Sequence, residues 1–330
     1  MFVFTEDLKS QTGYGVVVRN LYKALGKYME VQCGTEFEER FIKALTKDDF
    51  ILVRPFFQNP FRFNTEAQII GHYALESTKL PERLVRECND DRMVQVWVPS
   101  NYVKSIAVSN GIIEDKLKVI PHGYNPDIFH DYTEHFRKNE NFQFLFVGGY
   151  TGKGDRKGAD LIAEASRLLY GHTTQPFVVK FKINTTYGVN YTEIYQDLAA
   201  PHHILDFENY PDEKMGDIYN SADCFITASS GEAFNMTLLE AMACGLPAIS
   251  PLNTGERDFA TQIDYPLLEF QEVPARYTPW DNGNWFRPDI GEIKDKMNAV
   301  IKAMPVRRSY NLVGYTWDEV AKKVVECLNG

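Results

Sequence analysis

Short apolar runs alternate with amphipathic stretches along nearly the whole chain. This pattern predicts an α/β protein, because strands that alternate with helices form parallel sheets covered by those helices. In the first half the apolar runs predict six strands, at residues 2–5, 30–34, 50–54, 69–73, 94–99 and 118–121. Two helices fit between them, at residues 15–28 and 101–110, and Gly111 is a stop signal for the second.

The second half continues the alternation. It predicts strands at 142–147, 177–183, 204–207 and 224–228, and helices at 158–169, 212–221, 235–244, 290–304 and 317–328. Residues 130–141 carry many charges without apolar periodicity and are predicted to be a linker. We therefore expect two Rossmann-like domains facing each other across a cleft, at 1–135 and 141–312. A C-terminal helix within 313–330 is expected to cross back to the first domain.

Composition narrows the class of protein. The 330 residues are 44% hydrophobic and 24% charged, as in ordinary globular domains, and the net charge of -10 with scattered basic residues argues against nucleic acid as a partner. The five cysteines are far apart and never form C-x-x-C, which argues against a disulfide framework or zinc cluster. The N-terminus lacks the pattern of a signal peptide, and no run reaches the ~18 apolar residues of a membrane span. We expect a cytoplasmic protein, and peripheral contact with a membrane stays open.

One stretch places charge where apolar side chains dominate. The segment GEAFNMTLLEAMACGLPAI, residues 231–249, holds Glu232 just before a helix and Glu240 inside it. Asn235 is a good N-cap, and the preceding strand should bring this helix start to the carboxyl edge of the sheet. Backbone amides and the helix dipole then favour a bound phosphate, and each carboxylate can hold a different part of one ligand. The simpler alternative is a pair of solvated glutamates.

Two glycine-rich loops are further candidates. The segment VGGYTGKGDRKGADLIAEA, residues 147–165, places Lys153, Arg156 and Lys157 where they can neutralise a diphosphate, although a solvated basic loop explains it equally well. It lacks the spacing of a P-loop. Gly13 and Gly15 form a tight turn between the first strand and the first helix.

Taken together, the motifs resemble a known family. They are Glu232 and Glu240 eight positions apart, the FVGG…RKG loop, VWVPSNYVKSIAVSNGI at 96–112, KLKVIPHGYNPDIF at 116–129, YPDEKMGDIYNSADCFITAS at 210–229 and YTWDEVAKKV at 315–324. The chain resembles, over essentially its whole length, the retaining GT-B glycosyltransferases of group 1, family 4 type. This family includes bacterial mannosyltransferases, sucrose synthase and glycogen synthases.

The resemblance implies that the second domain binds a nucleotide-sugar donor and the first domain an acceptor. It implies that Glu232 binds the sugar hydroxyls and Glu240 the ribose, and that His72 or Glu76, within GHYALES at 71–77, reaches the reacting sugar. The remaining donor-binding residues would be Phe234, Asn235, Met236 and Thr237 at sugar and phosphate, Phe207 and Tyr210 beside the base, and Gly13 and Gly15 against the diphosphate.

One departure from the family concerns the diphosphate. Family members usually carry an arginine where this chain has Gly149. Either Lys153 or Arg156 replaces the missing arginine, or the contacts to the diphosphate are weaker than in the family. Among the basic residues of this loop, Lys157 is the strongest candidate to bind the diphosphate. Gly149 therefore keeps open the alternative of a nucleotide-sugar-binding or scaffold protein whose catalysis has decayed.

The expected reaction is transfer of a sugar from a UDP- or GDP-sugar to a hydroxyl of a glycan, glycolipid or protein glycan. We expect no cofactor and no metal, because cations and helix-end amides stabilise the leaving phosphate and no D-x-D pair occurs. The resemblance implies retention at the anomeric carbon, and we hypothesise that the leaving phosphate takes the acceptor proton. A glycosidase is disfavoured, because two acids on one loop and helix do not easily straddle a glycosidic bond. The motifs also argue against a nucleotide-sugar epimerase.

An aromatic-rich segment at 273–289, with Tyr277, Trp280 and Trp285, stands apart from these motifs. We interpret it as a surface loop that packs its own aromatic side chains, with a cover over the cleft as the alternative.

Overall fold

The computed structural model describes residues 1–329 except 6, 7, 11, 35–38, 63, 133–140, 174, 187, 189 and 277–282. The chain forms two compact units. Unit 1 contains Met1–Gly123 and the C-terminal segment from Val313, and unit 2 contains the chain from Tyr124 to Leu312 apart from a short segment at 278–283.

The division after Gly123 comes before the predicted linker at 130–141, most of which lies outside the described residues. Residues 124–132 are tied to unit 2 instead. The Tyr132 hydroxyl donates to Asp217 at 3.0 Å, and the Tyr132 amide donates to the side chain of Asn220 at 3.2 Å. These bonds explain why unit 2 begins earlier in the chain than charge patterning alone indicates.

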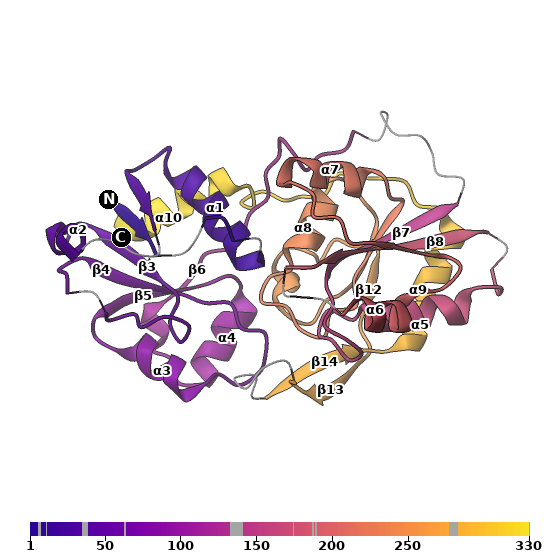
Figure 1. The fold of residues 1–330 in the computed structure, drawn as a ribbon, viewed down its shortest axis with the longest axis horizontal. Coiled ribbons are helices and arrows are strands. Elements are labelled where there is room, and N and C mark those ends of the chain that lie inside the picture. Colours follow the sequence, from indigo (N-terminus) through magenta and orange to yellow (C-terminus); the bar gives the residue numbers. More distant parts are fainter. Residues whose placement is uncertain are drawn as a thin grey trace. The chain divides into compact units, whose positions relative to one another are not determined.

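Unit 1 is a six-stranded parallel sheet in the order β2-β1-β3-β4-β5-β6 (Figure 1). The strands are β1 Phe2–Phe4, β2 Val31–Cys33, β3 Phe50–Val53, β4 Gln68–His72, β5 Met93–Val98 and β6 Leu117–Val119. Its helices are α1 Gly13–Leu25, α2 Glu39–Ala44, α3 Glu82–Asn89, α4 Asn101–Ser109 and α10 Trp317–Asn329, with a 3-10 turn at Glu114–Lys116. All six predicted strands and three predicted helices form, each shifted by a few residues at most.

The C-terminal helix α10 packs against α1 within unit 1. The Asp318 carboxylate accepts from Lys27 Nζ and from the Tyr28 hydroxyl, each at 3.0 Å. At the start of α10, a Cβ on Gly123 would lie 2.8 Å from the Trp317 amide, so glycine permits this close approach.

Unit 2 is a second six-stranded parallel sheet, in the order β12-β11-β10-β7-β8-β9 (Figure 1). The strands are β7 Phe142–Gly149, β8 Phe177–Asn184, β9 His203–Asp206, β10 Cys224–Ile226, β11 Ala248–Pro251 and β12 Tyr265–Leu267. The helices are α5 Ala159–Leu169, α6 Tyr191–Leu198, α7 Asp212–Asn220, α8 Met236–Ala243 and α9 Ile290–Ala303, with a 3-10 turn at Gly255–Asp258. One face of β7 and β8 forms the core with α5 and α9.

The aromatic-rich segment is not simply a loop, and that prediction is wrong for its two ends. Strands β13, Phe270–Pro274, and β14, Asn284–Pro288, pair as an antiparallel hairpin. Trp285 is buried opposite Val273, and the Phe286 amide donates to the Ser230 carbonyl at 2.7 Å. Tyr277 and Trp280 lie outside the described residues. The hairpin therefore attaches to the loop that follows β10.

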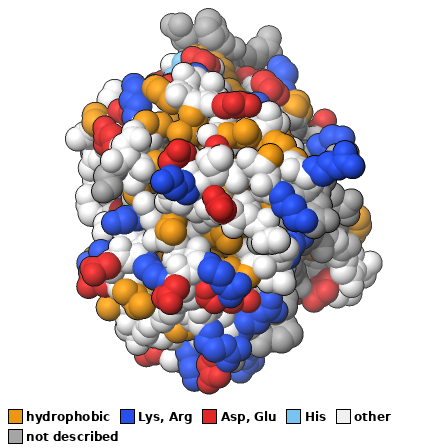
Figure 2. All heavy atoms as spheres, turned by 90° about the vertical axis from the view of Figure 1, so that its left-hand side faces the viewer, with side chains coloured by type: hydrophobic (Ala, Val, Ile, Leu, Met, Phe, Trp, Pro, Cys, Tyr) orange, Lys and Arg blue, Asp and Glu red, His pale blue; other side chains and the backbone are white. Residues whose placement is uncertain are grey.

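Two surface features complete the description. Among the described residues, no helix combines the length and the apolar character that crossing a bilayer requires. On the face in Figure 2, acidic side chains lie among the basic ones, and hydrophobic side chains lie singly or in small groups.

Candidate functional site

The strand order of unit 2 reverses between β7 and β10, since the chain runs outward from β7 through β9 and then from β10 through β12. Ligands of open α/β sheets bind at the carboxyl ends of the strands at such a switch point. The loops after β7 and β10 meet there: the Ser230 amide donates to the Arg156 carbonyl at 2.7 Å. Gly158 has φ 71°, and a Cβ there would lie 2.1 Å from the Ala228 carbonyl oxygen, so this contact requires glycine.

Glu232 lies at this junction with its side chain buried and paired to two cations. Lys157 Nζ is 2.6 Å from one carboxylate oxygen, and an Arg156 guanidinium nitrogen is 3.2 Å from the other. Burial alone would raise the pKa of Glu232, but Lys157 and then Arg156 outweigh it and hold the pKa below its usual value. The carboxylate is therefore ionised at neutral pH, and the three side chains together keep one positive charge for an anionic ligand.

The backbone of Glu232 is fixed from the segment after β11. Its amide donates to the Thr254 hydroxyl at 3.0 Å, and that hydroxyl donates to Glu256 at 2.7 Å. The fully buried Glu256 also accepts the amides of Asn253 and Thr254, and burial raises its pKa to about 7 despite these bonds. Gly255 donates to the Glu232 carbonyl at 2.9 Å. These residues hold the Glu232 loop in place, and sequence reasoning missed them.

The start of α8 has the predicted N-cap. Asn235 adopts φ 78°, and its side-chain oxygen accepts from the Leu238 amide at 3.3 Å and from the Thr237 hydroxyl at 3.1 Å. The Asn235 side-chain nitrogen is buried yet has no hydrogen-bond partner among the described residues. A buried donor of this kind is normally satisfied, so it is suited to a ligand oxygen. Phe234 is buried against Phe259, with ring centroids 5.0 Å apart, and supports the turn from below.

Glu240 is partly buried in the apolar face of α8. The fully buried Tyr219 hydroxyl on α7 donates to its carboxylate at 2.7 Å. Burial raises the pKa of Glu240 to about 7, and the Tyr219 bond limits the rise. The carboxylate therefore changes charge near neutral pH, and Tyr219 is a second residue that the sequence did not indicate.

Replacement of Tyr219 by phenylalanine should push the pKa of Glu240 further above about 7, because the hydrogen bond that lowers it is lost. Less ionised Glu240 then remains at pH 7. If Glu240 binds the ribose, as the family resemblance implies, nucleoside diphosphate affinity should fall by roughly 2- to 10-fold there, as for one hydrogen bond. The affinity should recover as the pH rises. Calorimetric titration with UDP and GDP from pH 6 to 9 measures this shift, and an unchanged pH profile would separate Tyr219 from nucleotide binding.

The other predicted cations are placed differently. Arg156 points to Glu232 and donates to the Gly231 carbonyl. Lys153 is exposed and makes no hydrogen bond or ion pair with the described residues. Gly149 ends β7, and no atom of the described residues lies within 4 Å of a Cβ built there. A side chain at position 149 would therefore enter open space.

Phe207 and Tyr210 follow β9 at the same carboxyl edge. The Phe207 ring packs against Tyr191 and Tyr195 at 5.1 and 5.8 Å between centroids. The Tyr210 hydroxyl donates to Asp206 at 3.1 Å, and burial together with Asp206 raises the pKa of Tyr210 to about 12. Both rings lie two strands from β7, which agrees with a role beside the far end of an extended ligand.

Unit 1 has its own switch point between β1 and β3. Tyr14, at the start of α1, lies with its ring 4.2 Å from the Arg54 guanidinium that follows β3. Its hydroxyl is 3.0 Å from Nδ1 of His72, and the two rings stack at 5.1 Å. His122, within the segment at 116–129, lies edge-on to His72 at 6.0 Å. The structure thus builds a second cluster at the carboxyl edge of the first sheet.

His72 is buried, and burial together with nearby Arg54 lowers its pKa to about 3. It is a neutral imidazole at physiological pH and acts as a hydrogen-bonding group. Glu76 lies four residues on, partly exposed in the loop after β4. Gly13 opens α1, and a Cβ on Gly15 would lie 2.4 Å from the Ser10 carbonyl oxygen, so Gly15 is required by local packing.

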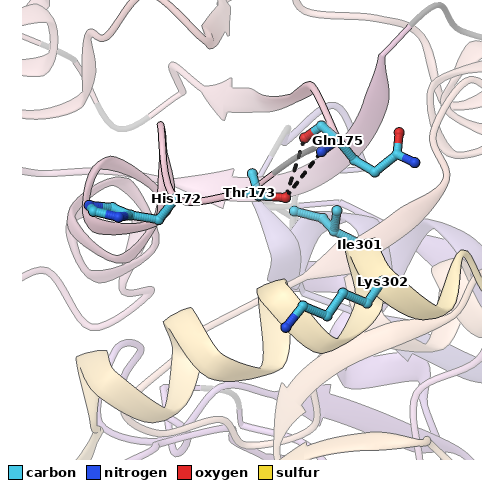
Figure 3. Close-up of a pocket in the computed structure, with 5 residues that line it drawn as sticks. All are labelled: His172, Thr173, Gln175, Ile301 and Lys302. Carbon is cyan, nitrogen blue, oxygen red and sulfur yellow. Dashed lines mark hydrogen bonds between the residues drawn. The ribbon is translucent and has the colours of Figure 1, made fainter.

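A pocket in unit 2 lies away from the switch point of that unit, before the amino end of β8 (Figure 3). It measures about 260 Å³ and is lined by His172, Thr173, Gln175, Ile301 and Lys302. The Thr173 hydroxyl accepts from the Gln175 amide at 3.3 Å, which closes a small turn. The Glu232 cluster is at the carboxyl ends of the strands, so this pocket belongs to the opposite edge of the sheet. Among the described residues, no group of three or more His, Cys, Asp or Glu side chains is arranged to hold a metal ion.

Comparison with known proteins assigns the domain that carries Glu232. Residues 141–262 match the sequence profile of the glycosyl transferases group 1 family. Unit 2 is a group 1 glycosyltransferase domain. The chain is also 25% identical, over 239 residues, to an uncharacterized glycosyltransferase of Sulfolobus islandicus rod-shaped virus 1, covering 72% of this chain and 66% of the viral protein. It is 26% identical over 156 residues to mannosylfructose-phosphate synthase of Agrobacterium fabrum, covering 44% and 34%. The matches span less than two thirds of either relative.

Solved glycosyltransferase structures share the fold of the whole chain. Sucrose-phosphate synthase from Thermosynechococcus elongatus superposes with a TM-score of 0.68 at 14% identity, over 99% of this chain and 98% of that one. Anabaena HepE in complex with UDP-glucose gives 0.66 at 13% identity, over 99% of both chains. These likenesses confirm the predicted GT-B fold class with two Rossmann-like domains.

Within the glycosyltransferase domain, the structure brings together Glu232, Arg156 and Lys157, while Gly149 and Lys153 make no contact with them. Sequence reasoning missed the supporting residues Tyr219, Thr254 and Glu256. Thr254 and Glu256 follow β11 in the segment NTGERD, whose turn-forming composition was the one available signal.

Replacement of Tyr14 by phenylalanine keeps the stack on His72 and removes the hydroxyl 3.0 Å from Nδ1. We expect turnover to fall by roughly 5- to 10-fold, as for one hydrogen bond, because the imidazole loses the partner that fixes its orientation. Steady-state kinetics should show the loss in kcat rather than in donor KM. Tyr22→Phe on the same helix is the matched control, and an equal effect of both variants would argue against a role for the hydroxyl of Tyr14.

Proposed function

We propose that this protein is a retaining glycosyltransferase that moves a sugar from a UDP- or GDP-sugar to a hydroxyl group of a glycan, glycolipid or protein glycan. One observation carries the proposal: a buried, ionised Glu232 shares two cations at the switch point of a group 1 domain. A carboxylate suits sugar hydroxyls, and the remaining positive charge suits a diphosphate.

The chemistry follows from the charges. When the bond between the anomeric carbon and the diphosphate breaks, positive charge grows on the sugar and negative charge on the leaving phosphate. Lys157, the start of α8 and the Asn235 side-chain nitrogen can meet the phosphate oxygens, a contribution of ~3 to 4 kcal/mol for one well-placed donor. The proposal requires no divalent metal, and the leaving phosphate takes the proton of the acceptor.

We assign donor binding to unit 2 and acceptor binding to unit 1. Glu240, tied to Tyr219, is proposed to hold the ribose, with Phe207 and Tyr210 beside the base. His72, held by Tyr14, is proposed to contact the transferred sugar from unit 1. The solved complex of HepE with UDP-glucose supports a nucleotide-sugar donor, whereas the relatives' names differ in sugar and acceptor.

The second candidate is a protein that binds nucleotide sugars without turning them over. The open position at Gly149 favours it, because a side chain that would contact a diphosphate from the end of β7 is missing.

A donor panel distinguishes the two candidates. The protein is incubated with UDP-, GDP- and ADP-sugars, with and without glycan and lipid acceptors, and nucleotide release is measured. Proton NMR of the product then gives its anomeric configuration. Transfer with the configuration of the donor supports the proposal, inversion contradicts the retaining mechanism, and saturable binding without turnover supports the second candidate.

A further inference from the structure

Lys182, on β8, carries a buried ammonium that forms no ion pair with a carboxylate among the described residues. The residue is 5% exposed, and its Nζ makes a long hydrogen bond, 3.5 Å from the Ile183 carbonyl oxygen. The Nζ also lies 5.9 Å from the centroid of the Tyr210 ring. Asp206, its neighbour on β9, pairs with Lys180 at 2.9 Å instead. A buried charge without a partner destabilises the folded protein, so a protein that keeps one normally supplies a partner for it.

The direction of Lys182 follows from the strand register. Val147 on β7 lies beside Lys182, and Gly149 lies beside Asn184. Residues two apart in a strand point to the same face, so Lys182 and Gly149 share one face of the sheet. The bond to Ile183 carries the ammonium toward the carboxyl end of β8. Lys182 therefore points along the face on which the end of β7 is left open.

An anion at that edge of the sheet would pair with this ammonium. The space at Gly149 is free of atoms within 4 Å of a Cβ, and Arg156 and Lys157 are both engaged with Glu232. Burial lowers the pKa of Lys182 and nearby Lys180 adds to this effect, while Asp206 and Glu208 offset it only in part. An incoming anion would offset it further. A neutral base carbonyl would leave the charge uncompensated, whereas a phosphate oxygen would neutralise it.

We infer that Lys182 binds a phosphate oxygen of the donor's diphosphate, approaching from β8 across the open end of β7. This inference rests on the proposed function, because the donor supplies the diphosphate. It assigns the diphosphate contact to a residue outside the glycine-rich loop, on a strand whose other residues pack the core or pair with β9. It also makes Lys182 a determinant of affinity for the phosphate part of the donor.

Lys182→Met tests this inference, since methionine fills a similar volume without charge. Calorimetric titration with UDP, UMP and uridine, and in parallel with GDP, GMP and guanosine, compares the variant with the wild type. We expect UDP or GDP affinity to fall about 10- to 100-fold, as for a hydrogen bond to a charged group, with a smaller loss for the monophosphate and none for the nucleoside. The melting temperature of the ligand-free variant should be unchanged or higher, because an unpaired buried charge is removed. Lys294→Met, a partly exposed site on α9, controls for the change in net charge.

Two outcomes would overturn the inference but not the proposed function. One is a diphosphate affinity that is unchanged in Lys182→Met. The other is a loss of affinity that is equal for the nucleoside and the diphosphate, which would show that Lys182 contacts the base. In both cases the wild type would still bind and turn over a nucleotide sugar. A wild type that binds none of the nucleoside diphosphates would instead overturn the proposed function, and the inference with it.

Discussion

Replacing Glu232 with alanine should lower kcat/KM for the donor by about 100-fold or more, the loss typical of removing one well-placed group that orients or stabilises the reacting atoms. The carboxylate is buried at the junction of the two loops and is held by Lys157 at 2.6 Å. Its removal eliminates the contact to the transferred sugar and releases both cations. Steady-state assays of nucleotide release measure the loss.

Folding and catalysis are separated by the choice of variants. Glu232→Gln keeps the volume and the backbone bond to Thr254 but loses both ion pairs, so the variant should still fold, with a melting temperature below that of the wild type, while its turnover falls. Glu213→Gln, an exposed site on α7, is the matched control and should keep full activity. Turnover at the wild-type rate in both Glu232 variants would show that this carboxylate takes no part in the reaction.

Replacing Lys157 with methionine should have an effect of similar size, about 100-fold on kcat/KM, because one ammonium serves both Glu232 and the leaving phosphate. The variant should also change the pH dependence. In the wild type, Lys157 and Arg156 hold the pKa of Glu232 below its usual value, so the carboxylate stays ionised in weak acid. With Arg156 alone the pKa rises, and the acid limb of the pH profile should move to higher pH.

The pH dependence of folding stability should also change in Lys157→Met, in the direction set by the pKa of Glu232. A carboxyl with a depressed folded-state pKa contributes stability above its unfolded pKa and loses it as the pH falls through the folded value. The Lys157→Met protein should therefore lose less stability than the wild type on acidification, as measured by thermal melts between pH 7 and pH 3. Lys294→Met is the control. A pH profile that superposes on that of the wild type would contradict the pairing of Lys157 with Glu232.

The elements that the sequence predicts well are those whose signal is local. Five of the first six residues of β7 are apolar, with Gln143 as the exception, and Gly111 and Gly245 mark helix ends with positive φ. Helix α3 escaped prediction because only Leu84 and Cys88 are buried in its eight residues. The β13 and β14 hairpin escaped because its pairs join residues on either side of a long aromatic segment.

For the site, the sequence predicts which charged residues can bind a ligand, but it does not predict the contacts that hold these residues in place. Glu232 and Lys157 are 75 residues apart, and they meet only because the strand order reverses between β7 and β10. Tyr219 and Glu256 belong to residue types that are common in any protein, and their roles arise from burial and from partners that no local pattern reveals. The role proposed for the buried Lys182 could not be predicted from local sequence either, because it depends on the register of β7, β8 and β9.

In the proposed mechanism Glu232 holds the sugar while other residues hold the nucleotide. Calorimetric titration of wild type and Glu232→Gln with a bare nucleoside diphosphate and with the matching nucleotide sugar separates these two roles. The variant should bind the bare diphosphate within about twofold of the wild type and bind the nucleotide sugar at least about 10-fold more weakly, as for one hydrogen bond to a charged group. Equal loss for both ligands, or no loss for either, would contradict this mechanism.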